Sequence, residues 1–158
     1  IKVLPQNIET TIIKAETGGK EVDEVFAPQP AVIHIEDDID ISRGDYFVHA
    51  DQLPTVANEF EALVCWMDHK ELVIGNKYFL QHRSKLIKTI IKEIDYKLDV
   101  NSLEKTPTDS VKLNEVVKVT LKTASPLVHD SFEKNKGTVS AILVDETSNS
   151  TVGAVMIL

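Results

Sequence analysis

The chain has 158 residues, 42% of them hydrophobic, and a formal net charge of −8. This length suits one ordinary domain or two small ones, and the hydrophobic fraction is large enough for a packed core, which excludes a disordered tail. An acidic chain is poorly suited to binding nucleic acid or an anionic membrane surface, because both are negatively charged. The single cysteine, Cys65, cannot form an internal disulfide, which fits a reducing, cytoplasmic compartment.

The N-terminal sequence suggests that more chain precedes it. It has no starting Met, opens inside an apolar pattern at residues 1–5, and does not have the form of a secretory signal. Natural chain ends are usually less regular than this. No apolar run approaches the roughly 20 residues of a membrane-spanning helix. We therefore expect this sequence to be part of a longer chain and to contain no membrane-spanning helix itself.

Most of the chain alternates between apolar and polar residues, which is typical of half-buried strands. Gly18-Gly19 predicts a hairpin turn between two such segments. Three sets of residues are each predicted to share one strand face: Ala31, Ile33 and Ile35; Val117, Val119 and Leu121; and Val139, Ala141 and Leu143. The continuous apolar run at residues 62–67 predicts a strand buried on both faces. Many short strands at close spacing favour an all-β barrel or sandwich.

Residues 85–100 fit two different structures. In a helix, one face would carry Leu86, Ile87, Ile90, Ile91 and Ile94. At a period of two, one strand face would instead carry Ile90, Ile94, Tyr96, Leu98 and Val100, with Lys92 as the exception. The β-branched content favours the strand. A linker is predicted at residues 51–54, where the strand pattern stops and Pro54 disfavours a helical conformation for Leu53.

Two polar segments have superficial functional matches. Residues 38–42 resemble the start of a calcium-binding loop, but Arg43 and His49 occupy the positions where that loop needs Gly and Glu. A solvated turn between strands is therefore expected at residues 36–40. Arg43-Gly44-Asp45 is the tripeptide of integrin ligands. In a chain without disulfides or a signal peptide, Gly44 is more simply explained by a positive φ before the next strand.

Catalytic, metal-binding and nucleotide-binding motifs are absent from the sequence. The histidines lack the spacing of a zinc motif, and Cys65 has no second cysteine nearby; they are His34, His49, His69, His82 and His129. His129-Asp130-Ser131 holds the residue types of a catalytic triad, but adjacent residues of an extended chain point in opposite directions. No phosphate-binding glycine loop and no complete Asn-Lys-x-Asp motif occurs. The sequence predicts no catalytic, cofactor-binding or metal-binding residue.

Four segments taken together resemble a known family. They are Ile39-Asp40-Ile41-Ser42-Arg43-Gly44-Asp45 with His49-Ala50-Asp51; Val64-Cys65-Trp66-Met67 ahead of Gly75-x-Lys77-Tyr78; Pro126-Leu127-Val128-x-Asp130-x-Phe132; and Val144-Asp145-x-x-Ser148-Asn149-x-Thr151-Val152-Gly153-Ala154. In this order they resemble the region after the GTPase domain in the large subunit of bacterial sulfate adenylyltransferase. The Arg-Gly-Asp turn and the Thr-Val-Gly-Ala ending are also similar to the barrel domains of elongation factor Tu. Departures from the pattern lie at residues 105–109 and at Ser140 and Ala141.

The resemblance implies an all-β fold of two translation-factor-like antiparallel β-barrels, the first one truncated. Residues 1–52 would form the later part of the first barrel and residues 53–158 the whole second barrel, with residues 85–100 as a strand.

The resemblance also implies a function for the parent protein. The parent would use GTP hydrolysis to drive formation of adenylyl sulfate from ATP and sulfate. GTP and Mg would bind a GTPase domain outside this chain, and a small catalytic partner subunit would transfer the adenylyl group. The chain alone would be inactive and would act as a scaffold for both. The alternatives are the barrel region of a translation elongation factor and an adhesive β-domain.

Overall fold

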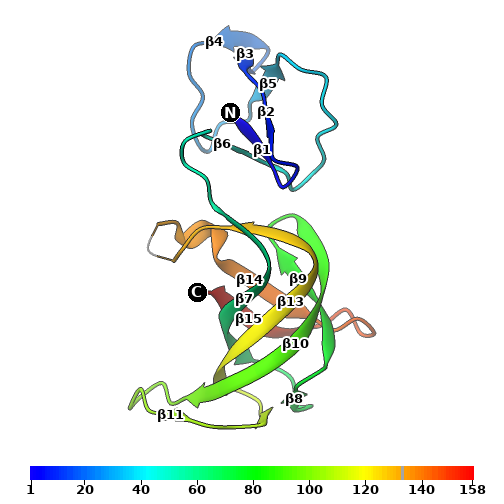
Figure 1. The fold of residues 1–158 in the computed structure, drawn as a ribbon, viewed down its shortest axis with the longest axis vertical. Coiled ribbons are helices and arrows are strands. Elements are labelled where there is room, and N and C mark those ends of the chain that lie inside the picture. Colours follow the sequence, from blue (N-terminus) through cyan, green and yellow to red (C-terminus); the bar gives the residue numbers. More distant parts are fainter. Residues whose placement is uncertain (133) are drawn as a thin grey trace. The chain divides into compact units, whose positions relative to one another are not determined.

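The computed structural model describes residues 1–132 and 134–158 and confirms an all-β chain (Figure 1). Within these residues the helical structure is a single 3-10 turn, η1 (Lys136–Thr138). The chain divides into two compact units, Ile1–Leu53 and Pro54–Leu158. That the first unit is the later part of a larger barrel stays a prediction.

The first unit contains two small antiparallel sheets. One has the order β2-β1-β6, with β1 (Lys2–Leu4), β2 (Ile8–Glu9) and β6 (Tyr46–Val48). The other has the order β4-β3-β5, with β3 (Ile12–Thr17), β4 (Lys20–Val22) and β5 (Val32–Ile35).

The predicted hairpin and strand face in this unit are largely confirmed. Gly18 and Gly19 have φ values of 56° and 74°, and the turn that they form brings Thr17 opposite Lys20. Such left-handed values cost glycine little. In β5, Ile33 and Ile35 are half-buried, whereas Val32 and His34 are exposed; Ala31 lies outside the strand.

The second unit is a closed antiparallel barrel. In its described residues, six strands form the ring β9-β10-β13-β7-β15-β14, and β14 pairs back with β9. The ring consists of β7 (Thr55–Trp66), β9 (Lys77–His82), β10 (Lys85–Leu98), β13 (Val116–His129), β14 (Ser140–Val144) and β15 (Thr151–Ile157). Outside the ring, β8 (Leu72–Val73) pairs with β12 (Ser110–Val111), and β11 (Lys105–Thr106) extends β10. Closure removes the free sheet edges that would otherwise pair with other chains.

The barrel core consists of every second residue of the ring strands. The two predicted faces are buried: Val117, Val119, Leu121, Val139 and Leu143 are fully buried and Ala141 is buried, although Val139 lies just before the first residue of β14. A buried Val or Leu side chain stabilises a fold by about 1.5–3 kcal/mol relative to leaving it exposed. These faces therefore account for much of the stability of the barrel.

The stretch with two possible structures is a single strand, β10. It contains register shifts between Ile91 and Glu93 and between Ile94 and Tyr96. Each irregularity inserts an extra residue and moves the alternation out of phase. The buried isoleucines are Ile87, Ile91 and Ile94, and the first irregularity accounts for the odd interval between the last two. Intervals of four and three residues are also those of a helix face, which explains why the sequence fitted both structures. The predicted face was wrong in membership, because Ile90, Tyr96 and Leu98 are only half-buried and Val100 lies beyond the strand.

The prediction that residues 62–67 are buried on both faces was also wrong. Ala62, Val64 and Trp66 fill the barrel interior with no exposed surface. Leu63 and Cys65 point to the outside and are half-buried, and Met67 is 51% exposed. A barrel wall is a single sheet, so its outer face has no second layer of its own to cover it. A continuous apolar run can therefore occupy such a wall without being fully buried.

Candidate functional site

The residues that the sequence singled out do not form a common centre. Among the described residues, no three His, Cys, Asp or Glu side chains are grouped so as to hold a metal ion. His49 and His69 are exposed, and His34 lies 3.3 Å from the carboxylate of Glu16. The described residues contain no helix with the length and apolar character of a membrane span.

The Arg-Gly-Asp segment forms a turn before β6. Gly44 has a φ of 94°, which confirms the expected positive value. The backbone N–H of Asp45 donates to the carbonyl of Ser42 at 3.0 Å, and its carboxylate accepts from the N–H of Ser42 and the amide of Gln6, both at 2.9 Å. The Asp45 carboxylate thus contributes to the structure of the turn.

The acidic residues at 36–38 and Asp40 are exposed in the connection between β5 and β6, as expected.

A network of polar groups holds the connection between β13 and β14. Nε2 of the buried His82 donates to the carbonyl of Thr138 at 2.7 Å, and the guanidinium of Arg83 donates to the carbonyl of Gly137 at 2.8 Å. Burial lowers the pKa of His82 below its ordinary value. The carboxylate of Asp130 accepts from the hydroxyl of Thr138 at 3.0 Å and from the amide of Asn135 at 3.2 Å.

This network does not form a catalytic triad. His129 is buried and packs against the ring of Phe60, with 5.7 Å between centroids. Its Nδ1 donates to the backbone carbonyl of Asp130 at 3.2 Å, so the Asp130 side chain is not its partner. Within the described residues, its Nε2 has no hydrogen-bond partner. The geometry fits a structural role for these groups.

The Asp-x-x-Ser-Asn motif between β14 and β15 forms a hydrogen-bonded turn. Oδ1 of Asp145 accepts from the N–H of Thr147 at 3.0 Å, and from the N–H and hydroxyl of Ser148 at 2.7 and 2.9 Å. These bonds, those from Ser148 first, hold the pKa of Asp145 below its usual value. Asn149 follows with a φ of 56°, a conformation that Asn tolerates better than most residues. The motif therefore serves the turn that joins two barrel strands.

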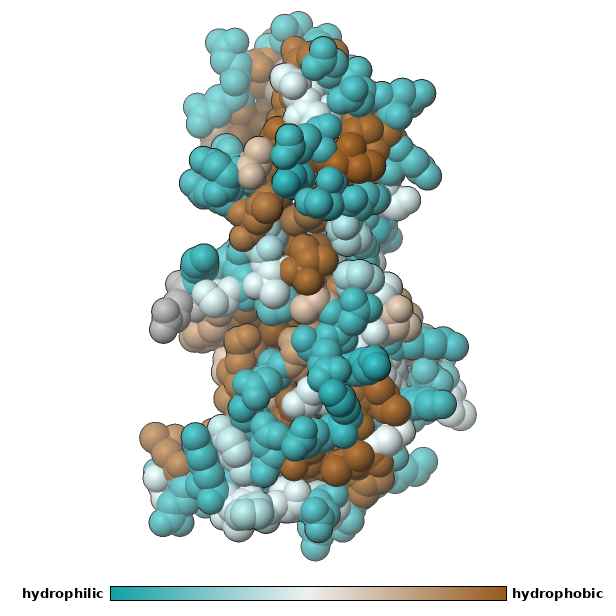
Figure 2. All heavy atoms as spheres, viewed as in Figure 1, coloured by the Kyte–Doolittle hydropathy of each residue, from teal (hydrophilic) through white to brown (hydrophobic). Residues whose placement is uncertain are grey.

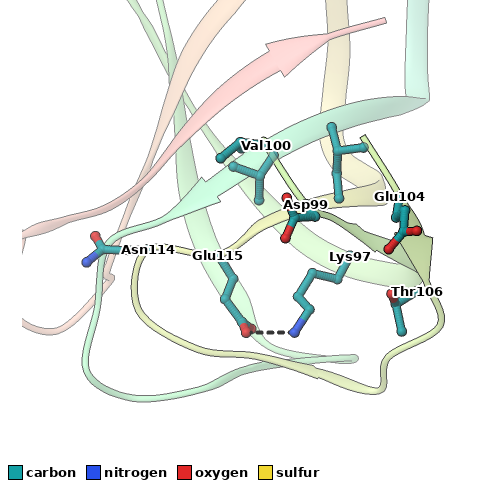
Figure 3. Close-up of a pocket in the computed structure, with 9 residues that line it drawn as sticks. Lys97, Asp99, Val100, Glu104, Thr106, Asn114 and Glu115 are labelled. Carbon is teal, nitrogen blue, oxygen red and sulfur yellow. Dashed lines mark hydrogen bonds and ion pairs between the residues drawn. The ribbon is translucent and has the colours of Figure 1, made fainter. Parts of the chain in front are cut away.

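A cavity of about 370 Å³ lies at the C-terminal end of β10 (Figure 3). Its charged side chains are Lys97, Asp99, Glu104 and Glu115. Lys97 donates to Glu115 at 2.9 Å, an ion pair drawn as a dashed line in Figure 3. The N–H of Lys112 donates to Glu115 at 2.8 Å; this bond, with the contribution of Lys97, lowers the pKa of the carboxyl. The cavity thus carries three carboxylates and one ammonium group.

A hairpin between β10 and β11 borders this cavity and carries an apolar tip. Val100 and Leu103 are 64% and 68% exposed. Figure 2 shows hydrophobic residues at the end of this hairpin, which Figure 1 draws beside the label of β11. No residue of this site was predicted from the sequence, although residues 105–109 depart from the family pattern. The available signal was the pair of apolar residues within an otherwise polar turn.

The hairpin is held by hydrogen bonds at its base. Oδ1 of Asp99 accepts from the N–H groups of Asn101 and Ser102 at 2.8 and 2.9 Å, and these bonds lower the pKa of Asp99. The N–H of Leu103 donates to the carbonyl of Asp99 at 2.8 Å. The ammonium group of Lys105 lies 4.7 Å from the ring centroid of Tyr96, a favourable cation–π distance. The tip is thus presented by an ordered turn.

Comparison with known proteins gives two consistent results. The chain is 36% identical over 158 residues to sulfate adenylyltransferase subunit 1 of Bacteroides fragilis, and 39% identical over 160 residues to the bifunctional enzyme CysN/CysC of Mycobacterium tuberculosis. It spans 33% and 26% of the length of these relatives. The crystal structure of sup35 complexed with GDP shares the fold, with a TM-score of 0.86, 15% identity, and coverage of 99% of this chain and 39% of that chain.

The first two matches confirm the resemblance to the large subunit of sulfate adenylyltransferase, and the sup35 structure shows a shared fold. A family model described as "GTP-eEF1A C-terminal domain-like" matches residues 59–158, which span nearly the whole barrel unit. The chain therefore belongs to the GTP-eEF1A C-terminal domain-like family.

Proposed function

We propose that this chain is the barrel region of a GTP-dependent sulfate adenylyltransferase large subunit. The observation that carries the proposal is identity of 35–39% along the whole chain to proteins named as subunit 1 of that enzyme or as CysN/CysC. The parent protein would couple GTP hydrolysis to the formation of adenylyl sulfate from ATP and sulfate. GTP and Mg would bind a GTPase domain elsewhere in the parent protein.

The role assigned to this chain is non-catalytic. Two carboxylates that each accept two or more hydrogen bonds, those of Asp130 and Asp145, are used in turns between barrel strands. A closed barrel is a rigid body, and rigid bodies transmit a nucleotide state by repacking at their interfaces. The chain would therefore hold the GTPase domain and the small catalytic subunit in a productive arrangement.

Two measurements on the isolated chain test this role. In sedimentation velocity, the chain should form a complex with the purified small subunit, and in a phosphate-release assay it should not hydrolyse GTP. Release of phosphate from GTP by the chain alone would refute the non-catalytic role. Failure to form a complex with the small subunit at micromolar concentrations would refute the proposed scaffolding role.

A translation elongation factor is the second candidate, because the chain shares its fold with sup35. The acidic charge of the chain is unfavourable for this alternative, since binding to RNA relies on basic side chains. Filter binding of the full-length parent to aminoacylated transfer RNA separates the two functions. The sulfate-activating proposal predicts no saturable binding at physiological salt, and tight binding would favour the translation factor.

A further inference from the structure

We propose that the hairpin at residues 99–104 and the adjacent cavity form a docking site for a segment of the small partner subunit. The segment would carry an arginine or lysine beside apolar side chains. The identity of this partner rests on the function proposed above, whereas the chemistry of the site rests on the hairpin itself.

The apolar part of the site is the tip formed by Val100 and Leu103. Leu103 is the most exposed large hydrophobic side chain in the described chain, at 68%. Single exposed apolar residues are common, but two on one projecting turn offer a compact anchor for a partner pocket. Because the turn is hydrogen-bonded at its base, little conformational entropy is lost when the tip is bound.

The backbone conformation of the tip is unfavourable for a leucine. Leu103 has a φ of 60°, in the left-handed region that Gly and Asn occupy more easily. A turn that served only to connect β10 with β11 would be more stable with one of those residues. The presence of a leucine at this position is explained if its side chain makes contacts outside this chain.

The charged part of the site defines the occupant. Asp99 and Glu104 border the cavity, and neither forms an ion pair within the part of the chain that the structure describes, whereas Glu115 is already paired with Lys97. Hydrogen bonds from the N–H groups of Ser102 and Asn101 lower the pKa of Asp99 further below neutral, so its carboxylate is negatively charged at neutral pH. The cavity therefore has an excess of negative charge, which complements a guanidinium or ammonium group. The aliphatic stem of such a side chain could pack beside Val100 and Leu103.

The same charges favour a protein over other macromolecules. The carboxylates of Asp99 and Glu104 would repel the phosphates of a nucleic acid and of an anionic lipid. A cationic protein segment satisfies both the apolar tip and the acidic cavity. Insertion of the tip into a neutral lipid surface is the competing outcome that the experiment must detect.

The experiment measures the affinity of the full-length large subunit for the small subunit by isothermal titration calorimetry. The test variant combines Val100→Thr with Leu103→Asn; it removes the apolar contacts, and Asn suits the left-handed conformation at position 103. The matched control is Leu86→Thr, which alters a 56% exposed leucine on β10. Thermal unfolding of each variant checks that the barrel remains folded.

We expect the double variant to weaken binding at least tenfold and the control to change it less than twofold. Glu104→Lys should weaken binding about fivefold, and this loss should shrink as salt is raised. If the wild-type subunits associate and the double variant binds within twofold of wild type, the docking site is wrong and the proposed function stands. If the wild-type subunits do not associate, both the docking site and the proposed function are wrong. Hairpin-dependent sedimentation with phosphatidylcholine vesicles would also overturn the docking site.

Discussion

Gly153 on β15 lies directly opposite Trp66 on β7 in the barrel wall. A Cβ atom added at Gly153 would lie 3.4 Å from Cε3 of Trp66 and 3.2 Å from Cγ1 of Val64. The indole is fully buried and its Nε1 donates to the carbonyl of Lys70 at 2.7 Å. The Trp-Met and Thr-Val-Gly-Ala segments, far apart in sequence, thus meet in the barrel core. Their occurrence together in the family resemblance has a packing reason.

Replacing Gly153 with alanine should destabilise the barrel. Val64 is fully buried and cannot easily move away from the added methyl group. Overpacking a core costs about 1–3 kcal/mol, and restricting the unfolded chain returns about 0.5–1 kcal/mol. We expect a net loss of about 1 kcal/mol in the free energy of unfolding, measured with urea and circular dichroism, and a larger loss for Gly153→Val. Wild-type stability in the valine variant would contradict the close packing.

Replacing Trp66 with phenylalanine should cost about 2–3 kcal/mol. The change removes the hydrogen bond to the Lys70 carbonyl and leaves space beside Tyr78, whose ring lies 5.6 Å from the indole between centroids. Because Trp66 is the only tryptophan, its emission reports its own environment. Native protein should emit at short wavelength and shift to the red on unfolding. Native emission typical of a solvated indole would show that Trp66 is not in the core.

Leucine-to-alanine substitutions should distinguish the inside of the barrel from the outside. Leu121 is fully buried on β13, so Leu121→Ala should lower the free energy of unfolding by about 2–5 kcal/mol. Leu86 is 56% exposed on β10, and Leu86→Ala should change it by no more than about 0.5 kcal/mol. Urea denaturation of each variant measures the change in the free energy of unfolding. Similar losses at the two positions would be inconsistent with the strand register described above.

His82 should make the stability of the barrel depend on pH. Burial lowers its pKa in the folded state below the ordinary value of 6.5, so the unfolded chain binds more protons. The contribution of neutral His82 is fully present above about pH 6.5 and is lost as the pH falls toward the folded-state pKa. His129 and Arg83 nearby act in the same direction, because each lowers the pKa of His82.

The test compares wild type with His82→Gln, which keeps an N–H donor for the Thr138 carbonyl. Urea denaturation at pH 7.5 and pH 5.5 should show a smaller pH dependence in the variant. Lowered stability at both pH values with an unchanged difference between them would assign the pH dependence to other groups. The lowered carboxyl pKa values of Asp99, Asp145 and Glu115 act at more acidic pH.

Strand positions were predictable because alternation is a local signal. Alternation left a barrel and a sandwich open, and the family resemblance implied the barrel. The faces of β13 and β14, the Gly18-Gly19 hairpin and the positive φ of Gly44 all followed from short patterns. Membership of the β10 face was not predictable, because its two irregularities arise from pairing with β13. The outside-facing residues of β7 were misassigned because an apolar run does not reveal whether a second layer covers it.

The candidate docking site depended on spatial information that the sequence lacks. Lys97 and Glu115 are separated along the chain and meet only because β10 pairs with β13. The left-handed conformation of Leu103 has no sequence signal, since leucine rarely adopts it. No known sequence motif covers this region.

The most direct test of this account is the rate of adenylyl sulfate formation from ATP and sulfate by the full-length parent with its small subunit. The account predicts that the rate rises strongly when GTP is added and that a non-hydrolysable GTP analogue does not support the increase. A rate that is the same with and without GTP, or with and without the parent protein, would contradict it.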